Sequence, residues 1–92
     1  MGQYLSKTKF ISGSLYRLKR DMTFGQKYKK FGNDRADLKE NSHLLFLGTG
    51  KEPIVVDNIG DCFYFWFDNK IIYRYSNNTF ADWFEELKIN DV

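Results

Sequence analysis

The chain has 92 residues, of which 42% are hydrophobic and 18% aromatic, and its formal net charge is +2. This length supports one domain, residues 1–92, with a single modest core, and the apolar content excludes a disordered chain. The single cysteine excludes an internal disulfide, and the longest apolar run, Cys62 to Phe67, is far shorter than the roughly 20 residues of a transmembrane helix, so we expect a cytoplasmic protein.

The first residues fit a lipid-modification pattern. Gly2 followed by Ser6 matches the loose signature of N-myristoylation, and Lys7 and Lys9 supply the positive charge that a second, electrostatic anchor needs. The same combination arises by chance in about 1% of chains of average composition. The sequence therefore favours a chance match over a lipid anchor.

Apolar and polar side chains alternate along residues 15–22, which predicts the first strand. Tyr16, Leu18 and Met22 lie on its apolar face. Residues 24–32 carry three aromatic side chains at helical spacing, but glycines bound the segment closely. A helix, a single helical turn and a long loop therefore all remain open for this segment.

A turn at Leu38–Ser42 leads into a predicted strand at His43–Leu47, which Gly48–Gly50 ends. This turn and hydrophobic strand resemble a segment common in SH3-like small barrels, where a tight turn enters a central strand. Residues 53–56 are predicted as a short strand, and residues 57–61 as the turn that follows it.

The strongest β pattern lies in two arms, Cys62–Phe67 and Lys70–Tyr75, which consist almost entirely of aromatic and β-branched residues. Asp68 and Asn69 between them tolerate the positive φ of a two-residue hairpin turn, so Phe67 pairs with Lys70 and Cys62 with Tyr75. One face then carries Cys62, Tyr64, Trp66, Ile71, Tyr73 and Tyr75, and the other carries Phe63, Phe65, Phe67 and Ile72. Because both faces are apolar, we expect a second layer over the outer one.

The C-terminal segment, residues 80–88, has the pattern of an amphipathic helix that Asn78 or Thr79 can cap. Its apolar residues recur at spacings of three and four: Phe80, Trp83, Phe84 and Leu87. We expect this helix to cover the outer face of the hairpin. If it packs elsewhere and leaves Tyr64, Trp66 and Tyr73 open to solvent, the hairpin itself becomes the docking surface. The predicted fold is α+β and mainly β: a small SH3-like barrel or a strongly curled antiparallel sheet with a C-terminal α-helix.

The sequence offers no catalytic or cofactor-binding motif. His43 is the only histidine and Cys62 the only cysteine, so the usual Cys and His ligand spacings of a metal site cannot form. Gly48–Lys51 resembles the end of a phosphate-binding loop but lacks the earlier glycine and the Ser or Thr. A Cys62–His43 nucleophile pair remains open, although a cysteine in a packed strand is predicted to be a core thiol. We expect no enzyme, no metal and no cofactor.

Charge is distributed unevenly along the chain. Up to Ala36, nine basic residues stand against two acidic ones, a net charge of +7; from Asp37 onward, five basic residues stand against ten acidic ones, a net charge of −5. The basic third interleaves cations with aromatic residues, as do small barrels that bind single strands or RNA. The predicted partner-binding residues are Arg17, Lys19, Arg20, Lys27, Tyr28, Lys29 and Lys30. The alternative is a solvated face with its aromatic side chains turned into the core.

Two functions follow from these features. The first is a non-enzymatic protein-binding module that uses part of its aromatic surplus to bind and inhibit a host protein or nucleoprotein complex. In composition the chain resembles the small accessory proteins of AT-rich phages, which are short, single-domain and rich in Lys, Asn, Phe and Tyr. The second is direct nucleic-acid binding through the basic N-terminal third. Steep loss of binding with salt favours phosphate contacts, whereas salt-tolerant capture of a protein favours the first function.

Overall fold

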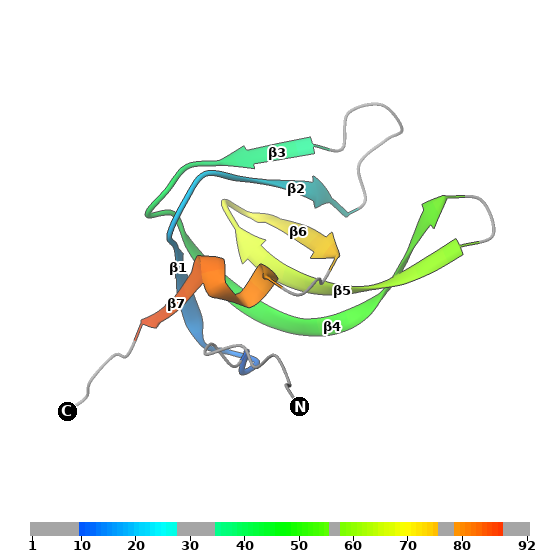
Figure 1. The fold of residues 1–92 in the computed structure, drawn as a ribbon. Coiled ribbons are helices and arrows are strands. Elements are labelled where there is room, and N and C mark those ends of the chain that lie inside the picture. The colour runs from blue at the N-terminus through cyan, green and yellow to red at the C-terminus, as the bar shows by residue number, and fades with distance from the viewer. Residues whose placement is uncertain (1–9, 28–34, 56–57, 76–78, 88–92) are drawn as a thin grey trace, which may run out of the picture.

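A computed structural model describes residues 10–27, 35–55, 58–75 and 79–87. These residues form one antiparallel sheet of seven strands and a single 3-10 helix (Figure 1). In chain order the elements are β1 (Leu15–Leu18), β2 (Met22–Gln26), β3 (Arg35–Leu38), β4 (His43–Val55), β5 (Asn58–Phe67), β6 (Lys70–Tyr75), η1 (Phe80–Trp83) and β7 (Phe84–Leu87). The strand order is β3-β2-β6-β5-β4-β1-β7. The mainly β prediction is confirmed, and in the described part of the chain the sheet does not close into a barrel.

The β5–β6 hairpin has the predicted register, from Phe67 opposite Lys70 to Cys62 opposite Tyr75. Asp68 and Asn69 adopt φ values of 51° and 61°, which a two-residue hairpin turn of type I′ requires. The prediction from local sequence is therefore confirmed. The turn type sets the strand twist and the pairing together, so no distant contact is needed to define this register.

The core lies on one side of the curled sheet, which we call the core face; the opposite side is the outer face. In the core, the rings of Phe65 and Phe84 stack, with centroids 5.2 Å apart and planes inclined by 5°. The buried cluster consists of Tyr16, Leu18, Met22, Phe24, Ala36, Leu38, Leu44, Phe46, Phe65, Ile72 and Phe84. Phe10 packs against it, with its ring centroid 4.9 Å from that of Tyr16 and 5.0 Å from that of Phe63. Tyr16, Leu18 and Met22 are therefore core residues, as predicted.

The predicted first strand is two strands. The chain bends at Lys19–Asp21, after which β2 pairs with β3 and β6, while β1 pairs with β4 and β7. The Asp21 carboxylate accepts a hydrogen bond from the backbone N–H of Glu40, 2.8 Å away, which ties this bend to the turn before β4. Because of this bend, residues 15–26 contribute strands to two separate parts of the curled sheet. The alternation of apolar and polar residues does not by itself predict the bend.

The segments around the hairpin are more extended than predicted. The start of residues 24–32 belongs to β2, and residues 28–34 lie outside the description. Residues 48–56 were expected as a strand end and a second short strand, yet β4 runs unbroken to Val55 with a bulge between Phe46 and Gly48. β5 already begins at Asn58, in the predicted turn. Figure 1 shows β4 and β5 curving together along their length. The bulge lets a long strand change direction without ending.

The prediction of a C-terminal helix at residues 80–88 is wrong. Residues 80–83 form one 3-10 turn, and β7 then pairs with β1, with Leu18 opposite Phe84 and Leu15 opposite Leu87. In an edge strand the backbone of β7 gains partners from β1 while Phe84 fills the core, so tertiary contacts override the helical pattern. The C-terminal segment consequently lies at the β1 edge of the sheet and does not cover the outer face of the hairpin.

Candidate functional site

Of the predicted partner-binding residues, the structure describes Arg17, Lys19, Arg20 and Lys27, and two of these cations are paired within the sheet. The Arg17 guanidinium donates through Nε to Oε1 of Glu85, at 3.1 Å, and through Nη1 to Oδ1 of Asn41, at 2.7 Å. The Nζ atom of Lys27 lies 2.6 Å from Oε2 of Glu52. Arg17 and Lys27 are thus each engaged within the sheet. Tyr28, Lys29, Lys30 and the Gly2 modification pattern lie outside the described residues.

Five apolar side chains instead form a continuous row across the outer face. Successive members are opposite one another on neighbouring strands, from β7 through β1, β4 and β5 to β6. The row consists of Leu87, Leu15, Leu45, Trp66 and Ile71. Directly opposite residues share one face of a sheet, so these side chains are neighbours. We call them the apolar row.

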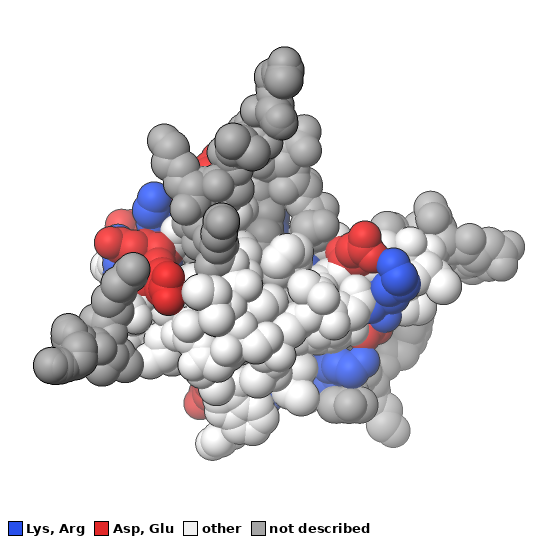
Figure 2. Space-filling view, turned by 90° about the horizontal axis from the view of Figure 1, so that it is seen from below, with Lys and Arg blue, Asp and Glu red and all other residues white. Residues whose placement is uncertain are grey.

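The apolar row is open to solvent at Trp66, which is 42% exposed. Leu47, two residues after Leu45 on β4, is 40% exposed. Figure 2, which views the molecule from below, shows a broad uncharged surface in the middle with acidic and basic side chains toward its margins. One margin follows from the register, since Glu85, Arg17 and His43 form the next row on the same face. An apolar centre with a charged rim is the usual anatomy of a protein-binding surface.

On the other side of the apolar row the outer face is filled by tyrosines. Tyr64 and Tyr73 are opposite one another, with ring centroids 6.1 Å apart, and the Tyr73 ring contacts that of Tyr75. Tyr64 donates its hydroxyl proton to Glu52, which also binds Lys27. Lys27 and then the Tyr64 hydroxyl lower the pKa of the Glu52 carboxyl, whereas burial and the adjacent Glu52 raise the pKa of Tyr64. This network holds the half-buried tyrosines in place, and Trp66 is the exposed side chain beside them.

Cys62 lies beneath these tyrosines and is fully buried. Burial, followed by the negative charge of Glu52, raises the pKa of its thiol, which disfavours the reactive thiolate. His43 is exposed, and Gly50 is the β4 residue opposite Cys62. His43 and Gly50 are seven residues apart on β4, which at the rise of a strand places His43 about 20 Å from Cys62. The two residues therefore do not form a nucleophile pair. Among the described residues no cluster of three His, Cys, Asp or Glu side chains could hold a metal ion.

Comparison with protein-family models, curated proteins and solved structures finds no significant match to this chain. Within the described ranges, no helix has the length and apolar character needed to cross a membrane.

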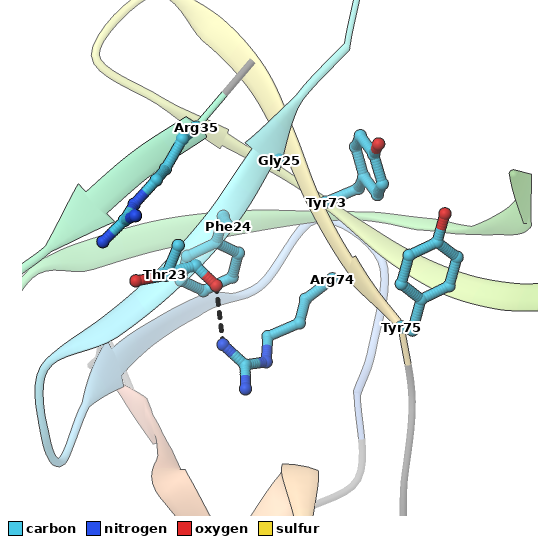
Figure 3. Close-up of a pocket in the computed structure, with 7 residues that line it drawn as sticks. All are labelled: Thr23, Phe24, Gly25, Arg35, Tyr73, Arg74 and Tyr75. Carbon is cyan, nitrogen blue, oxygen red and sulfur yellow. Dashed lines mark hydrogen bonds between the residues drawn. The ribbon is translucent and has the colours of Figure 1, made fainter. Parts of the chain in front are cut away.

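A second feature lies where the β1–β2 bend meets η1. The guanidinium carbon of Arg20 is 4.5 Å from the centroid of the Trp83 ring, and that of Arg74 is 5.4 Å from it. Arg74 also donates through Nη1 to the carbonyl oxygen of Thr23, at 2.6 Å, where β2 and β6 diverge (Figure 3). Arg20 was a predicted contact residue, but Arg74 and Trp83 were not.

Sequence reasoning missed both surfaces for the same reason. The apolar row forms only because β7 pairs with β1 and β1 with β4. The Arg20–Trp83–Arg74 group forms only because η1 lies beside the β1–β2 bend. One signal was present: both faces of the hairpin are apolar, so one of them had to be covered or functional. The covering element was assigned wrongly.

Proposed function

We propose that this protein is a non-enzymatic binding module that holds a partner protein on its apolar row. The observation that carries this proposal is the exposure of Trp66 within a row of apolar residues that spans five strands. Trp is the residue most enriched among side chains that dominate binding energy, and it acts best when neighbouring apolar residues exclude water around it. Of the two conditions for the hairpin to be the docking surface, the first is met, because residues 80–87 pack at the β1 edge. The second is met only at Trp66, since Tyr64 and Tyr73 are half-buried, so the proposed surface is centred on Trp66.

The scaffold supports this role. Trp66 is adjacent in sequence to the fully buried Phe65, and its strand is paired on both sides, with Leu45 and Ile71 as its neighbours. Such a side chain is presented by a rigid element and loses little conformational freedom on binding. We further propose that the partner is a host protein inhibited by having its surface occupied, a role supported by the phage-like composition.

We also propose that the curled sheet is an SH3-like small barrel. It is supported by the turn before β4, where Asn41 adopts a φ of 76° and its N–H donates to the carbonyl oxygen of Leu18, 2.8 Å away. β3 and β7 form the open edges of the described sheet.

The test is a pull-down from host lysate at low and at moderate salt, analysed by mass spectrometry. Trp66→Ser is the test variant, and Ile59→Ser is its matched control, because Ile59 is also an exposed apolar residue (65%) but lies near the distal end of the β4–β5 pair. We expect a protein that the wild type and Ile59→Ser capture at both salt concentrations and Trp66→Ser does not. Equal capture by all three proteins would contradict the proposal.

A further inference from the structure

Trp83 holds two guanidinium groups that come from distant parts of the chain. Arg20 belongs to the β1–β2 bend and Arg74 to β6, and both lie over its ring. Stacking on an indole orients an arginine while leaving its N–H donors free to bind elsewhere. Arg74 uses one of these donors on Thr23. The arrangement therefore brings two oriented cations to one indole ring.

These two cations repel one another. Burial and then the charge of Arg20 lower the pKa of Arg74, although an arginine stays protonated at any physiological pH. They border a hollow of about 510 Å3 that Lys39 also lines. Three cations facing one hollow raise the local concentration of anions.

The carboxylates in this hollow already have partners. Asp21 accepts from the Glu40 N–H, and Asp37 accepts from Oγ1 of Thr23, at 2.7 Å, and from Nε of Arg35, at 3.0 Å. Among the described residues, Arg20, Lys39 and Arg74 make no ion pair. The lining carries three positive charges against two negative ones, and Asp37 is also paired with Arg35, so the net charge around the hollow is positive.

A second hollow of about 400 Å3 lies on the other side of Arg74 and shares Thr23 and Arg74 with the first. It is lined by Tyr73 and Tyr75, which Figure 3 shows on one side of Arg74, with Arg35 on the other. The two adjoining hollows, which we together call the groove, are thus lined by both cations and aromatic rings. This is the combination that binds the backbone and bases of an unpaired strand.

We propose that this groove binds single-stranded nucleic acid, with Arg20 and Arg74 contacting its phosphate backbone in the hollow that both line. A phosphate accepts several charge-assisted hydrogen bonds at once and relieves the repulsion between the two arginines. Arg74 extends from β6 opposite Phe63, on the core face, so the groove is separate from the apolar row and does not depend on the protein-docking function.

The test measures binding of a fluorescein-labelled oligothymidylate of about 10 nucleotides, the size range that small single-strand sites cover. We expect Arg20→Gln and Arg74→Lys each to weaken binding about tenfold, the effect of losing one charge-assisted contact. For the wild type, log K should fall steeply with log salt; each lost phosphate contact should reduce that slope by about 0.7. Lys51→Gln is the matched control, because it removes the same charge at an exposed site outside the groove.

Trp83 supplies a second readout. The chain contains two tryptophans, so a Trp66→Phe protein reports fluorescence from Trp83 alone. We expect its emission to change when the oligothymidylate binds, and no comparable change with inorganic phosphate at the same phosphate concentration or with phosphatidylserine vesicles. Arg20 is exposed, so Arg20→Gln keeps the test valid even if Arg74→Lys unfolds.

Three results would overturn the proposal: no oligothymidylate binding at low salt, equal binding by Arg20→Gln and wild type, or a Trp83 response to vesicles without one to the oligonucleotide. Trp66→Ser should bind the oligonucleotide as the wild type does. A result against nucleic-acid binding in the groove can thus be distinguished from a result against protein binding on the apolar row.

Discussion

The ring of Tyr64 lies over Gly50, so that a Cβ atom at this position would be 2.5 Å from Cε2 of Tyr64. The glycine leaves room for an aromatic ring that covers the backbone of β4 and carries the hydroxyl bound to Glu52. We expect Gly50→Ala to destabilise the fold by about 1–3 kcal/mol, because the ring must shift and its hydrogen bond is lost. Urea denaturation measures this change.

A double-mutant cycle separates the steric effect from the β propensity of alanine. In a Tyr64→Ala background the space over Gly50 is empty, so Gly50→Ala should then cost much less than in the wild type. Equal costs in the two backgrounds would show that the ring does not set the requirement for glycine.

Phe65 and Trp66 are adjacent but face opposite sides of β5, so Phe65 should matter mainly for stability and Trp66 mainly for partner binding. We expect Phe65→Ala to cost about 3–5 kcal/mol, since it empties the centre of the core, and Trp66→Ala no more than about 1 kcal/mol. Partner capture should depend on Trp66. A loss of stability with Trp66→Ala as large as that with Phe65→Ala would mean that the apolar row is structural.

The Lys27–Glu52 pair predicts an acid-sensitive contribution to stability. Lys27 and the Tyr64 hydroxyl lower the pKa of Glu52 below the 4.5 of a free carboxyl. Because the folded-state pKa is depressed, this contribution is complete above about pH 4.5 and is lost as the pH falls toward the folded-state pKa. We expect Glu52→Gln to cost about 1 kcal/mol at pH 7 and progressively less as the pH falls through the folded-state pKa, measured by urea denaturation at a series of pH values.

Glu85→Gln is the control for this experiment. The pKa of Glu85 is also lowered, by its hydrogen bond with Arg17, but its side chain is 52% exposed and the pair is screened by solvent. A pH dependence of the same size for both variants would contradict the special role of the partly buried Glu52.

Cys62 should react with a thiol reagent only when the tyrosine cluster opens. The thiol is fully buried and its pKa is raised, so both access and thiolate formation oppose the reaction. We expect slow labelling by a thiol-specific disulfide reagent in native buffer and fast labelling in denaturant. Gly50→Ala, which displaces Tyr64, should speed up native labelling. Rapid labelling of the wild type would place the thiol at an accessible surface.

Prediction from the sequence worked where neighbours in the chain decide the structure. The β5–β6 register, the positive φ values of Asp68 and Asn69, and the core positions of Tyr16 and Leu18 were all correct. It failed at residues 80–88, because apolar residues at spacings of three and four suit a helix and also suit a 3-10 turn followed by a strand. The deciding factor was the free edge of β1, which lies more than sixty residues earlier in the chain.

The sequence by itself determined that the chain is mainly β, and it determined the hairpin with its two apolar faces, because a two-residue turn and side-chain alternation act locally. Only the tertiary structure decided which of those faces stays open, since that depends on where the C-terminal segment packs. It also decided which cations meet. Arg17 is paired with Glu85 and Lys27 with Glu52, whereas Arg20 and Arg74 both lie over the ring of Trp83. Charged residues far apart along the chain form ion pairs or repel one another only once the strands are paired.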